Sequence, residues 1–341
     1  MKAMVLRAPE ELVLDEVARP GPGASQVLVR VTHSGVCGTD FKIYSGAIPV
    51  SYPRIMGHEM VGEVAGSGDA ADTHAFRPGD RVIVDPELYC GACFHCRIGQ
   101  THLCANGMLI GRDTDGGFAE YVTAPASHVF RLPDSIDSRT APLIQVLTTC
   151  LHAQRQVNIF PAESVVVFGL GVTGQLHVQL AKARGASPVI GITRSAEKRE
   201  LAEKLGADLT IPGGEGAIQQ VREATEGRGA DLVIETTGVL PSLAAAVSMA
   251  RSGGRLLLFG IITAKEGALP FYDLYFKELA LISARVAKSE DYPSSIALVQ
   301  CGMVRLEPLV SNVMPLGELK TAIGMLGSDS GRRMKIILDH G

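Results

Sequence analysis

The chain has 341 residues, of which 46% are hydrophobic and 20% charged, so its length predicts about two domains, each with a core of its own. Thirty-two basic and 36 acidic residues give a net charge of −4, which argues against nucleic acid or an anionic membrane surface as a partner. No window approaches the ~18 apolar residues of a membrane span, and the first residues lack the apolar stretch of a signal peptide. We therefore expect a cytoplasmic protein.

The first 150 residues have the pattern of an irregular β-rich domain. Short alternating apolar runs such as Val27–Val31 and Met60–Val64 predict strands. Turn signals rich in proline and glycine, such as those at 19–23 and 77–80, separate the runs.

From about residue 161 the chain alternates between predicted strands and predicted helices. The strands are expected at Ser164–Phe168, Pro188–Thr193, Asp231–Glu235 and Gly254–Phe259. A helix follows the first strand as far as Arg184, and another spans Ala196–Leu205. Such alternation predicts an α/β fold with a doubly wound parallel sheet. The tail from about 285 holds a helix-like segment near Ser294–Cys301 and a strand-like Met334–Leu338, and the pattern does not assign it to either domain.

Gly169, Gly171 and Gly174 form the pattern G-x-G-x-x-G between a predicted strand and a predicted helix. In that setting the first glycine permits the tight turn and the second lets a pyrophosphate approach the backbone. The third permits close packing of helix on strand. The helix N-terminus then faces the phosphates, so we predict a dinucleotide site. A plain glycine-rich turn is the alternative.

The end of the second predicted strand bears on the choice of dinucleotide. An acidic residue there would bind the ribose of NAD, but Thr193 stands in its place, followed by Arg194 and, later, Lys198. A guanidinium at this position can bind a 2′-phosphate, so we predict a preference for NADP over NAD. Arg194 could instead be an ordinary surface residue at a helix start.

Four cysteines lie within fifteen residues. Cys90, Cys93, Cys96 and Cys104 have the spacing of a closed tetrahedral zinc site, which leaves no coordination position open for chemistry. An iron–sulfur cluster is the competing interpretation, although the last spacing differs from the ferredoxin pattern.

A second candidate metal site combines Cys37, in Cys-Gly-Thr-Asp, with His58 and Glu59, in Gly-His-Glu. One thiolate, one imidazole and one carboxylate suit a zinc ion that keeps a position open.

These motifs together resemble the zinc-containing alcohol dehydrogenase family of the medium-chain dehydrogenase/reductases. The resemblance covers nearly the whole chain and includes the segments 37–40, 57–59, 77–80, 90–104, 116–121 and 169–174. The Gly-His-Glu form and the short chain are most similar to the polyol and threonine dehydrogenase branch.

The resemblance implies a fold and a division of the chain. It implies a GroES-like catalytic domain over 1–150 with the zinc lobe at 90–104, a Rossmann domain over 151–284, and a segment, 285–341, that returns to the catalytic domain.

It also implies an activity, namely zinc-dependent hydride transfer between a secondary alcohol, polyol or sugar-alcohol and NAD(P), with no membrane or nucleic acid partner. A homodimer or homotetramer is expected. Cys37, His58 and Glu59 would hold or flank the catalytic zinc, Thr39 would relay a proton, Thr149 would lie near the nicotinamide, and Arg285 would lie near the substrate.

The sequence departs from the family pattern at two positions. Gln145 stands where relatives carry a Glu or Cys, and a neutral amide would only hydrogen-bond near the metal. Lys42 stands where many relatives place a relay histidine, so either Lys42 takes its place or the proton leaves through ribose hydroxyls and water. A simple solvated charge is the alternative interpretation of Lys42. The alternative functions are a non-catalytic dinucleotide-binding protein, which Gln145 favours, and a zinc-independent quinone or enoyl reductase, which the two sets of metal ligands disfavour.

Overall fold

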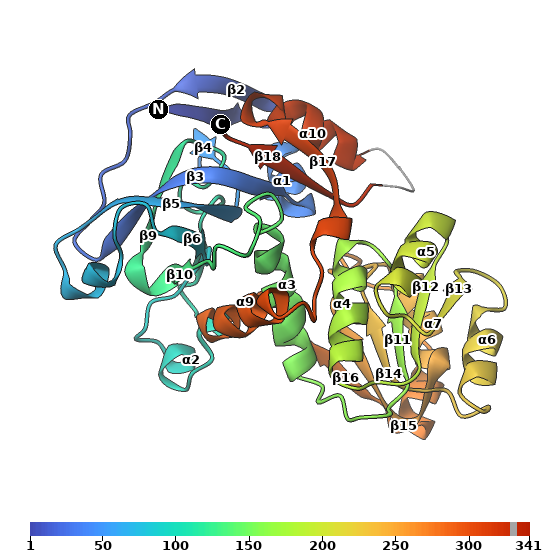
Figure 1. The fold of residues 1–341 in the computed structure, drawn as a ribbon. Coiled ribbons are helices and arrows are strands. Elements are labelled where there is room, and N and C mark those ends of the chain that lie inside the picture. Colours follow the sequence, from blue (N-terminus) through green and yellow to red (C-terminus); the bar gives the residue numbers. More distant parts are fainter. Residues whose placement is uncertain (328–332) are drawn as a thin grey trace. The chain divides into compact units, whose positions relative to one another are not determined.

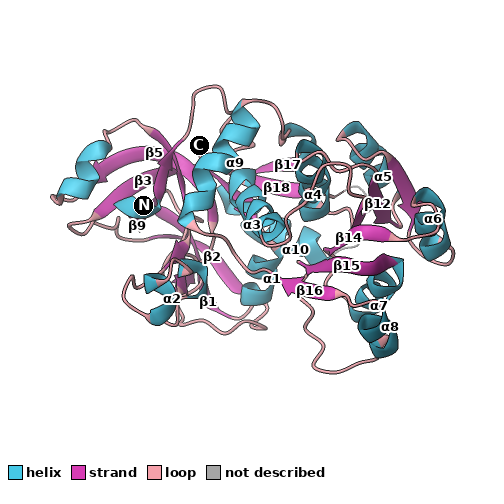
Figure 2. Cartoon of the chain, turned by 90° about the horizontal axis from the view of Figure 1, so that it is seen from below, coloured by secondary structure: helices cyan, strands magenta, loops and turns pink. Residues whose placement is uncertain are grey.

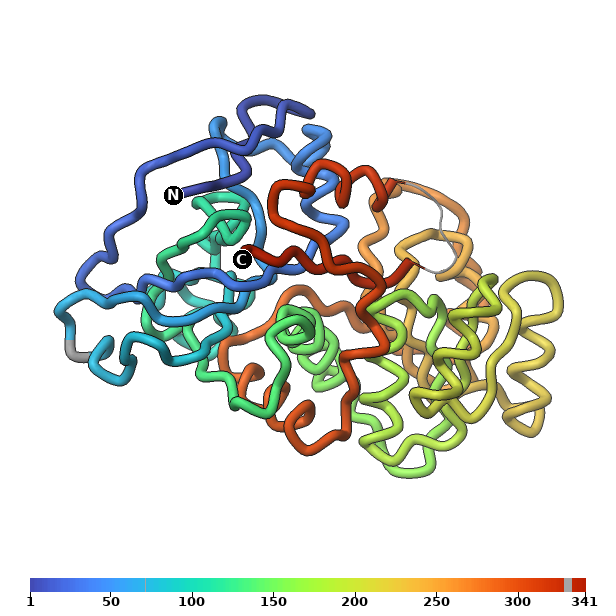
Figure 3. The backbone as a smooth tube through the Cα atoms, turned by 45° about the horizontal axis from the view of Figure 1, so that its top comes forward, coloured from blue at the N-terminus to red at the C-terminus, as the bar shows by residue number. Residues whose placement is uncertain are grey.

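A computed structural model describes residues 1–327 and 333–341, and these residues form two compact units. The first unit comprises Met1–Val146, Ala287–Gln300 and Val310–Gly341, and the second comprises Leu147–Val286 and Cys301–Leu309. Helix α3 (Leu143–Arg155) begins in the first unit and continues into the second. Both labelled ends of the chain lie in the first unit (Figure 3).

A mixed sheet of seven strands is the centre of the first unit. Its order is β10-β6-β5-β3-β18-β17, and β9 also pairs with β3. The strands are β3 (Gln26–Val36), β5 (Glu59–Ser67), β6 (Arg81–Val84), β9 (Tyr121–Pro125), β10 (Val129–Arg131), β17 (Val310–Pro315) and β18 (Lys335–Asp339). The long strand β3 lies antiparallel to both β5 and β18, so segments from the two ends of the sequence run side by side (Figure 1).

Smaller elements complete the first unit. They are the sheet β2-β1-β4 (Glu11–Glu16, Lys2–Ala8, Arg54–Ile55), the pair β7 (Glu87–Leu88) and β8 (Met108–Leu109), and the helices α1 (Gly38–Tyr44), α2 (Phe94–Arg97), α9 (Tyr292–Gln300) and α10 (Leu319–Gly327). One apolar core joins the small sheet to α10, and another fills the space beside β3, β5 and β9.

The second unit contains a parallel sheet of six strands in the order β13-β12-β11-β14-β15-β16. The strands are β11 (Val165–Phe168), β12 (Val189–Thr193), β13 (Leu209–Pro212), β14 (Ala230–Glu235), β15 (Ala250–Leu258) and β16 (Ala280–Ser283). This order reverses between β11 and β14, which is where open α/β sheets bind ligands.

Helices lie on both faces of this sheet (Figure 2). They are α4 (Val172–Ala183), α5 (Ala196–Lys204), α6 (Ala217–Ala224), α7 (Leu240–Met249) and α8 (Phe271–Phe276). Residues of α3, α4 and α5 belong to one core, and residues of α6 and α7 belong to the other. Because both faces are covered, the central strands β11 and β12 have buried apolar runs rather than an alternating pattern.

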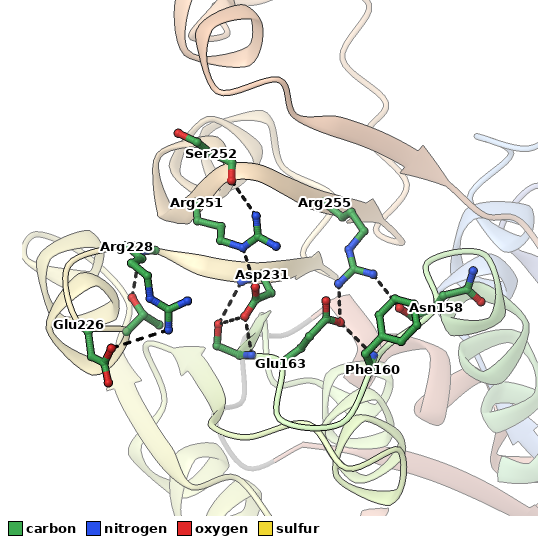
Figure 4. A network of polar contacts seen from close by, with 12 residues as sticks. Asn158, Phe160, Glu163, Glu226, Arg228, Asp231, Arg251, Ser252 and Arg255 are labelled. Carbon is green, nitrogen blue, oxygen red and sulfur yellow. Dashed lines mark hydrogen bonds and ion pairs between the residues drawn. The ribbon is translucent and has the colours of Figure 1, made fainter.

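Polar contacts join the amino-terminal ends of neighbouring strands in the parallel sheet (Figure 4). Asp231 accepts hydrogen bonds from the amide and hydroxyl of Ser164 and from Arg251 at 2.6–2.8 Å. Arg255 donates to Glu163 and to the carbonyls of Val157 and Asn158, which follow α3. These contacts fasten the segment that leads from α3 into β11 to two further strands.

The predicted fold class is confirmed, and the predicted elements are found. The expected strands at 27–31, 60–64, 164–168, 188–193, 231–235, 254–259 and 334–338 correspond to β3, β5, β11, β12, β14, β15 and β18. The helix-like segments preceding Arg184, at 196–205 and at 294–301 correspond to α4, α5 and α9. Among the described residues, no helix combines the length and apolarity needed to cross a membrane.

A buried carboxylate ties the segment before α9 to the strand that leads into the four-cysteine lobe. Asp85 directly follows β6, is 2% exposed, and accepts a hydrogen bond from the Ser289 hydroxyl at 2.6 Å. Tyr292 stacks on Phe130 with ring centroids 4.9 Å apart and also bonds to Asp85. Burial raises the pKa of Asp85 to about 6, although the hydrogen bonds from Ser289, Glu87 and Tyr292 lower it.

We expect Asp85 to make stability fall as the pH rises from about 4 to about 6. The folded pKa lies above the unfolded value of 3.8, so the folded state binds the proton more tightly. The shift corresponds to about 3 kcal/mol. Asp85→Asn lacks this titration, so the difference in free energy of unfolding between variant and wild type should grow by roughly that amount in favour of the variant from pH 4 to pH 7, as measured by urea titration. Asp134→Asn, at a side chain that is 99% exposed, is the control, and a flat Asp85 difference would contradict the assignment.

Candidate functional site

Cys37, His58 and Glu59 converge in the first unit. One ligand atom from each lies within 4.8 Å of the others. Cys37 follows the end of β3, and Glu59 opens the neighbouring strand β5. Because β3 and β5 are antiparallel, the end of one strand meets the start of the other, and this brings the three side chains together.

Glycines make room for this arrangement. Gly35 pairs with Glu59 across the strands, and a Cβ on Gly35 would lie 2.0 Å from a Glu59 carboxylate oxygen. Gly57 has φ +98°, and a Cβ there would meet the Phe118 ring at 2.7 Å. The Gly57–His58 turn therefore requires glycine for both conformation and space.

Asp40 links Cys37 and His58. It lies in the first turn of α1, is fully buried, and accepts the backbone N–H of Cys37 at 2.8 Å. Its other oxygen lies 3.3 Å from Nδ1 of His58, in a geometry that makes no hydrogen bond among the described residues. Burial lowers the pKa of His58, but the charges of Asp40 and Cys37 outweigh it and raise the pKa well above its usual value.

Lys335 is the residue that the sequence analysis missed. It opens β18, and its Nζ lies 2.7 Å from both carboxylate oxygens of Glu59. The side chains are 7% and 1% exposed. Burial lowers the pKa of Lys335, but Glu59 and Cys37 outweigh it and raise the pKa. The sequence shows only a lysine at the start of an apolar strand, which gives no sign of Glu59 as its partner.

The donor set fits a zinc ion. The thiol, imidazole and carboxylate are of the kinds that zinc binds, and Asp40 beside His58 resembles the carboxylate that orients a metal-bound histidine. The three potential anions, Cys37, Asp40 and Glu59, outnumber the two groups that can carry positive charge, Lys335 and His58, so the site favours a cation.

The four cysteines of the lobe also converge, with Sγ atoms of Cys90, Cys93, Cys96 and Cys104 mutually within 4.8 Å. Three Sγ–Sγ distances are 3.5–3.8 Å, close to the roughly 3.8 Å that a tetrahedron with zinc–sulfur bonds of about 2.3 Å requires. The backbone N–H groups of Ala92 and Cys93 help to lower the pKa of the Cys90 thiol to about 6, which favours the thiolate ligand. His95 lies on α2 beside Gln100 rather than in the sulfur cluster.

The glycine motif has the geometry of a dinucleotide site. Gly169 has φ +99°, and a Cβ on Gly174 would lie 1.9 Å from the carbonyl oxygen of Gly169, so the helix packs closely on the turn. By contrast, no described atom lies within 4 Å of a Cβ on Gly171, which caps α4. The turn therefore leaves open space at the helix N-terminus, where a pyrophosphate binds in such folds.

The end of β12, where the sequence analysis expects the ribose of the dinucleotide, is followed by basic residues. Thr193 ends β12, the Arg194 side chain is exposed, and Ser195 caps α5 by accepting the N–H of Lys198. Arg199, which the sequence analysis did not single out, donates to the carbonyls of Thr193 and Arg194 at 3.1 Å and fixes their backbone.

The remaining sequence-predicted residues lie on elements of both units. Thr39 and Lys42 are half-buried on α1, and Gln145 is buried in the first turn of α3. In the second unit, Thr149 is half-buried on α3, and Arg285 is exposed beyond β16.

Comparison with known proteins identifies both parts of the chain. The family profile of the alcohol dehydrogenase GroES-like domain matches residues 23–134, and that of the zinc-binding dehydrogenases matches residues 172–300.

Two relatives and one solved structure illustrate the match. A sorbitol dehydrogenase of Halalkalibacterium halodurans is 31% identical, with 99% of each chain covered. An L-threonine 3-dehydrogenase of Pyrococcus abyssi is 36% identical, over 89% of this chain and 87% of its own. A zinc-binding dehydrogenase of Sinorhizobium meliloti 1021, solved bound to NADP, has a TM-score of 0.93 at 31% identity and 99% coverage of both chains.

The matched profiles and relatives span the two units, and the two clusters of metal-ligating side chains and the glycine turn supply what zinc and a dinucleotide require. The chain belongs to the zinc-dependent, NAD(P)-linked alcohol dehydrogenases of the medium-chain dehydrogenase/reductase superfamily.

Proposed function

We propose that the protein transfers hydride between a secondary alcohol, polyol or sugar-alcohol and NADP, using Cys37, His58 and Glu59 as its catalytic metal site. The names of the relatives, which include sorbitol and L-threonine 3-dehydrogenases, support this class of substrate. The observation that carries the proposal is the set of three different donors, a half-buried thiol with a buried imidazole and a buried carboxylate, beside Asp40 and Lys335.

Zinc bound by this set would supply Lewis-acid chemistry that lowers the pKa of a substrate hydroxyl. Asp40 would hold the His58 ring in orientation while also accepting the Cys37 amide, so that one carboxylate positions two ligands. Thr39, between Cys37 and Asp40 in the chain, is the candidate to accept the substrate proton by hydrogen bond.

Lys335 sets the role of Glu59. With both carboxylate oxygens paired to the ammonium, Glu59 is held at the site as a partly neutralised group rather than as a free anion. Cys37 and His58 then would be the stronger ligands, and Glu59 would be a weaker or intermittent one. Gln145 would contribute an uncharged amide from α3.

In the second unit, the open space at Gly171 would admit the pyrophosphate, and Arg194 would bind the 2′-phosphate of NADP. The uncharged Thr193 side chain removes the repulsion that an acidic residue would exert on that phosphate. Thr149, Gly169, Gly174 and Lys198 complete the proposed dinucleotide site.

Cys37→Ser should abolish alcohol oxidation and leave dinucleotide binding intact. We expect a loss of kcat of at least about 10³-fold, because a metal supplies several kcal/mol of charge stabilisation. Zinc content should fall by one equivalent per chain while the four-cysteine lobe keeps its ion. The measurements are turnover across a panel of polyols and secondary alcohols, metal analysis, and titration with NADPH. Cys301→Ser is the matched control, and near-normal turnover of Cys37→Ser would refute the metal site.

Arg194→Ala should change the choice of cofactor. The wild type should use NADP with higher kcat/KM than NAD, and the variant should lose about 10–100-fold of the NADP value, the worth of a charge-assisted hydrogen bond. The NAD value should stay within about twofold. Arg228→Ala, at an arginine in the same unit, is the control. Higher efficiency with NAD in the wild type would overturn the assignment.

Lys335→Met should destabilise the protein by about 3–5 kcal/mol when no metal occupies the Cys37–His58–Glu59 site, because it leaves the Glu59 carboxylate buried without a counter-charge. The double variant Glu59→Gln/Lys335→Met removes both charges, so its loss should be well below the sum of the two single losses. Urea unfolding of the four proteins measures this coupling. Additive losses would show that the two side chains act independently.

A further inference from the structure

A pocket of about 320 Å³ lies in the first unit, and Cys37, His58 and Glu59 are not among the residues that line it. It is bounded by β1, β4, β9 and the chain that follows β2. Its walls include apolar side chains, namely Val5, Val17, Ile55 and Val122. The volume lies within the range of small-molecule sites, and neither unit's proposed chemistry uses this pocket.

One cationic side chain lines this pocket. The Arg54 side chain is only 14% exposed, and Nη1 donates to Asp115 at 3.0 Å. Its Nε is buried and unpaired among the described residues, and because water does not reach that atom, a ligand in the pocket would meet the Nη groups at the end of the guanidinium. A guanidinium carries five N–H donors, so this one retains capacity for an oxygen acceptor.

The carboxylate that pairs with Arg54 is mostly solvent-exposed and shares the paired oxygen with a second donor. Asp115 is 61% exposed at its side chain, and the oxygen that faces Arg54 also accepts the N–H of Ile55 at 3.1 Å. A second guanidinium, that of Arg19, lies 4.0 Å above the ring of Tyr121, which also lines the pocket. Arg54 on the wall and Arg19 beside Tyr121 thus give two cations near the pocket against one exposed carboxylate, which favours an anion.

We propose that this pocket binds a small amphipathic monocarboxylate, whose apolar body lies against Val5, Val17 and Val122 and whose carboxylate pairs with Arg54. Apolar walls favour the body, and the underused guanidinium favours a carboxylate over an amide or an ammonium. The site goes beyond the dehydrogenase function and does not depend on it.

The pocket also lies against the loop that presents His58. Gly116 lines it, and a Cβ on Gly116 would lie 2.2 Å from the carbonyl oxygen of Gly57. The amide of Gly116 donates to Ile55 at 2.8 Å. A single layer of backbone therefore separates the bound molecule from the turn before His58.

Calorimetric titration of the zinc-loaded full chain with octanoate at neutral pH tests the proposal, with octanamide as the uncharged match. We expect saturable binding of one octanoate per chain and at least tenfold weaker binding of octanamide. Arg54→Gln should weaken octanoate binding at least tenfold, and Arg54→Lys should weaken it less. Val17→Phe, which fills the pocket, should also weaken binding. Arg139→Gln, at an exposed ion pair of the same unit, is the control.

The variant Asp115→Asn tests whether Arg54 binds the ligand or only supports the fold. The amide oxygen can still accept the Ile55 N–H, but it no longer competes as an anion for Arg54, so octanoate should bind several-fold more tightly. Weaker binding in this variant would overturn the proposal. So would no saturable binding to the wild type, equal binding of octanamide, or binding that survives Arg54→Gln but is lost in Cys37→Ser, which would place the carboxylate at the metal site.

Discussion

The ion pair between Lys335 and Glu59 is the interaction on which the candidate metal site depends. It joins the starts of β18 and β5, which flank β3, and the partners are 276 residues apart in the chain. Two charges removed from water gain little net stability, yet each becomes costly if the other is missing. The pair therefore specifies one arrangement of three strands, and the absent side chain of Gly35 makes space for it.

Because Lys335 comes from β18, the candidate metal site is complete only when the whole first unit has folded. Cys37, His58 and Glu59 are near one another in sequence, but the counter-charge arrives only with β18, after the chain has passed through the second unit. The contact is of high sequence separation, so loop closure must precede its formation. The dinucleotide turn differs, because Gly169 and Gly174 meet within six residues and their packing requires only the adjacent strand and helix.

That difference explains what the sequence could predict. The glycine turn, the four cysteines and the three metal donors could be found because residue type and short spacing carry their chemistry. Lys335 could not be found, because a lysine at the start of an apolar strand gives no sign of the partner that faces it. Asp40 stood inside a quoted motif, but its contact with His58 depends on the antiparallel pairing of β3 and β5. The roles of Gln145 and Lys42 and the oligomeric state stay predictions, since each depends on groups outside the contacts described.

Two cation–carboxylate pairs on the same unit show how burial decides what an ion pair can do. At Lys335 and Glu59 both side chains are buried, and both carboxylate oxygens lie at 2.7 Å from one ammonium, so little capacity remains for a further anion. At Arg54 the cation is nearly as buried, but its carboxylate is mostly in water and uses one oxygen. Water screens the second pair and not the first. The guanidinium therefore keeps unmet hydrogen-bonding capacity beside an apolar pocket, whereas the ammonium is fully engaged with Glu59.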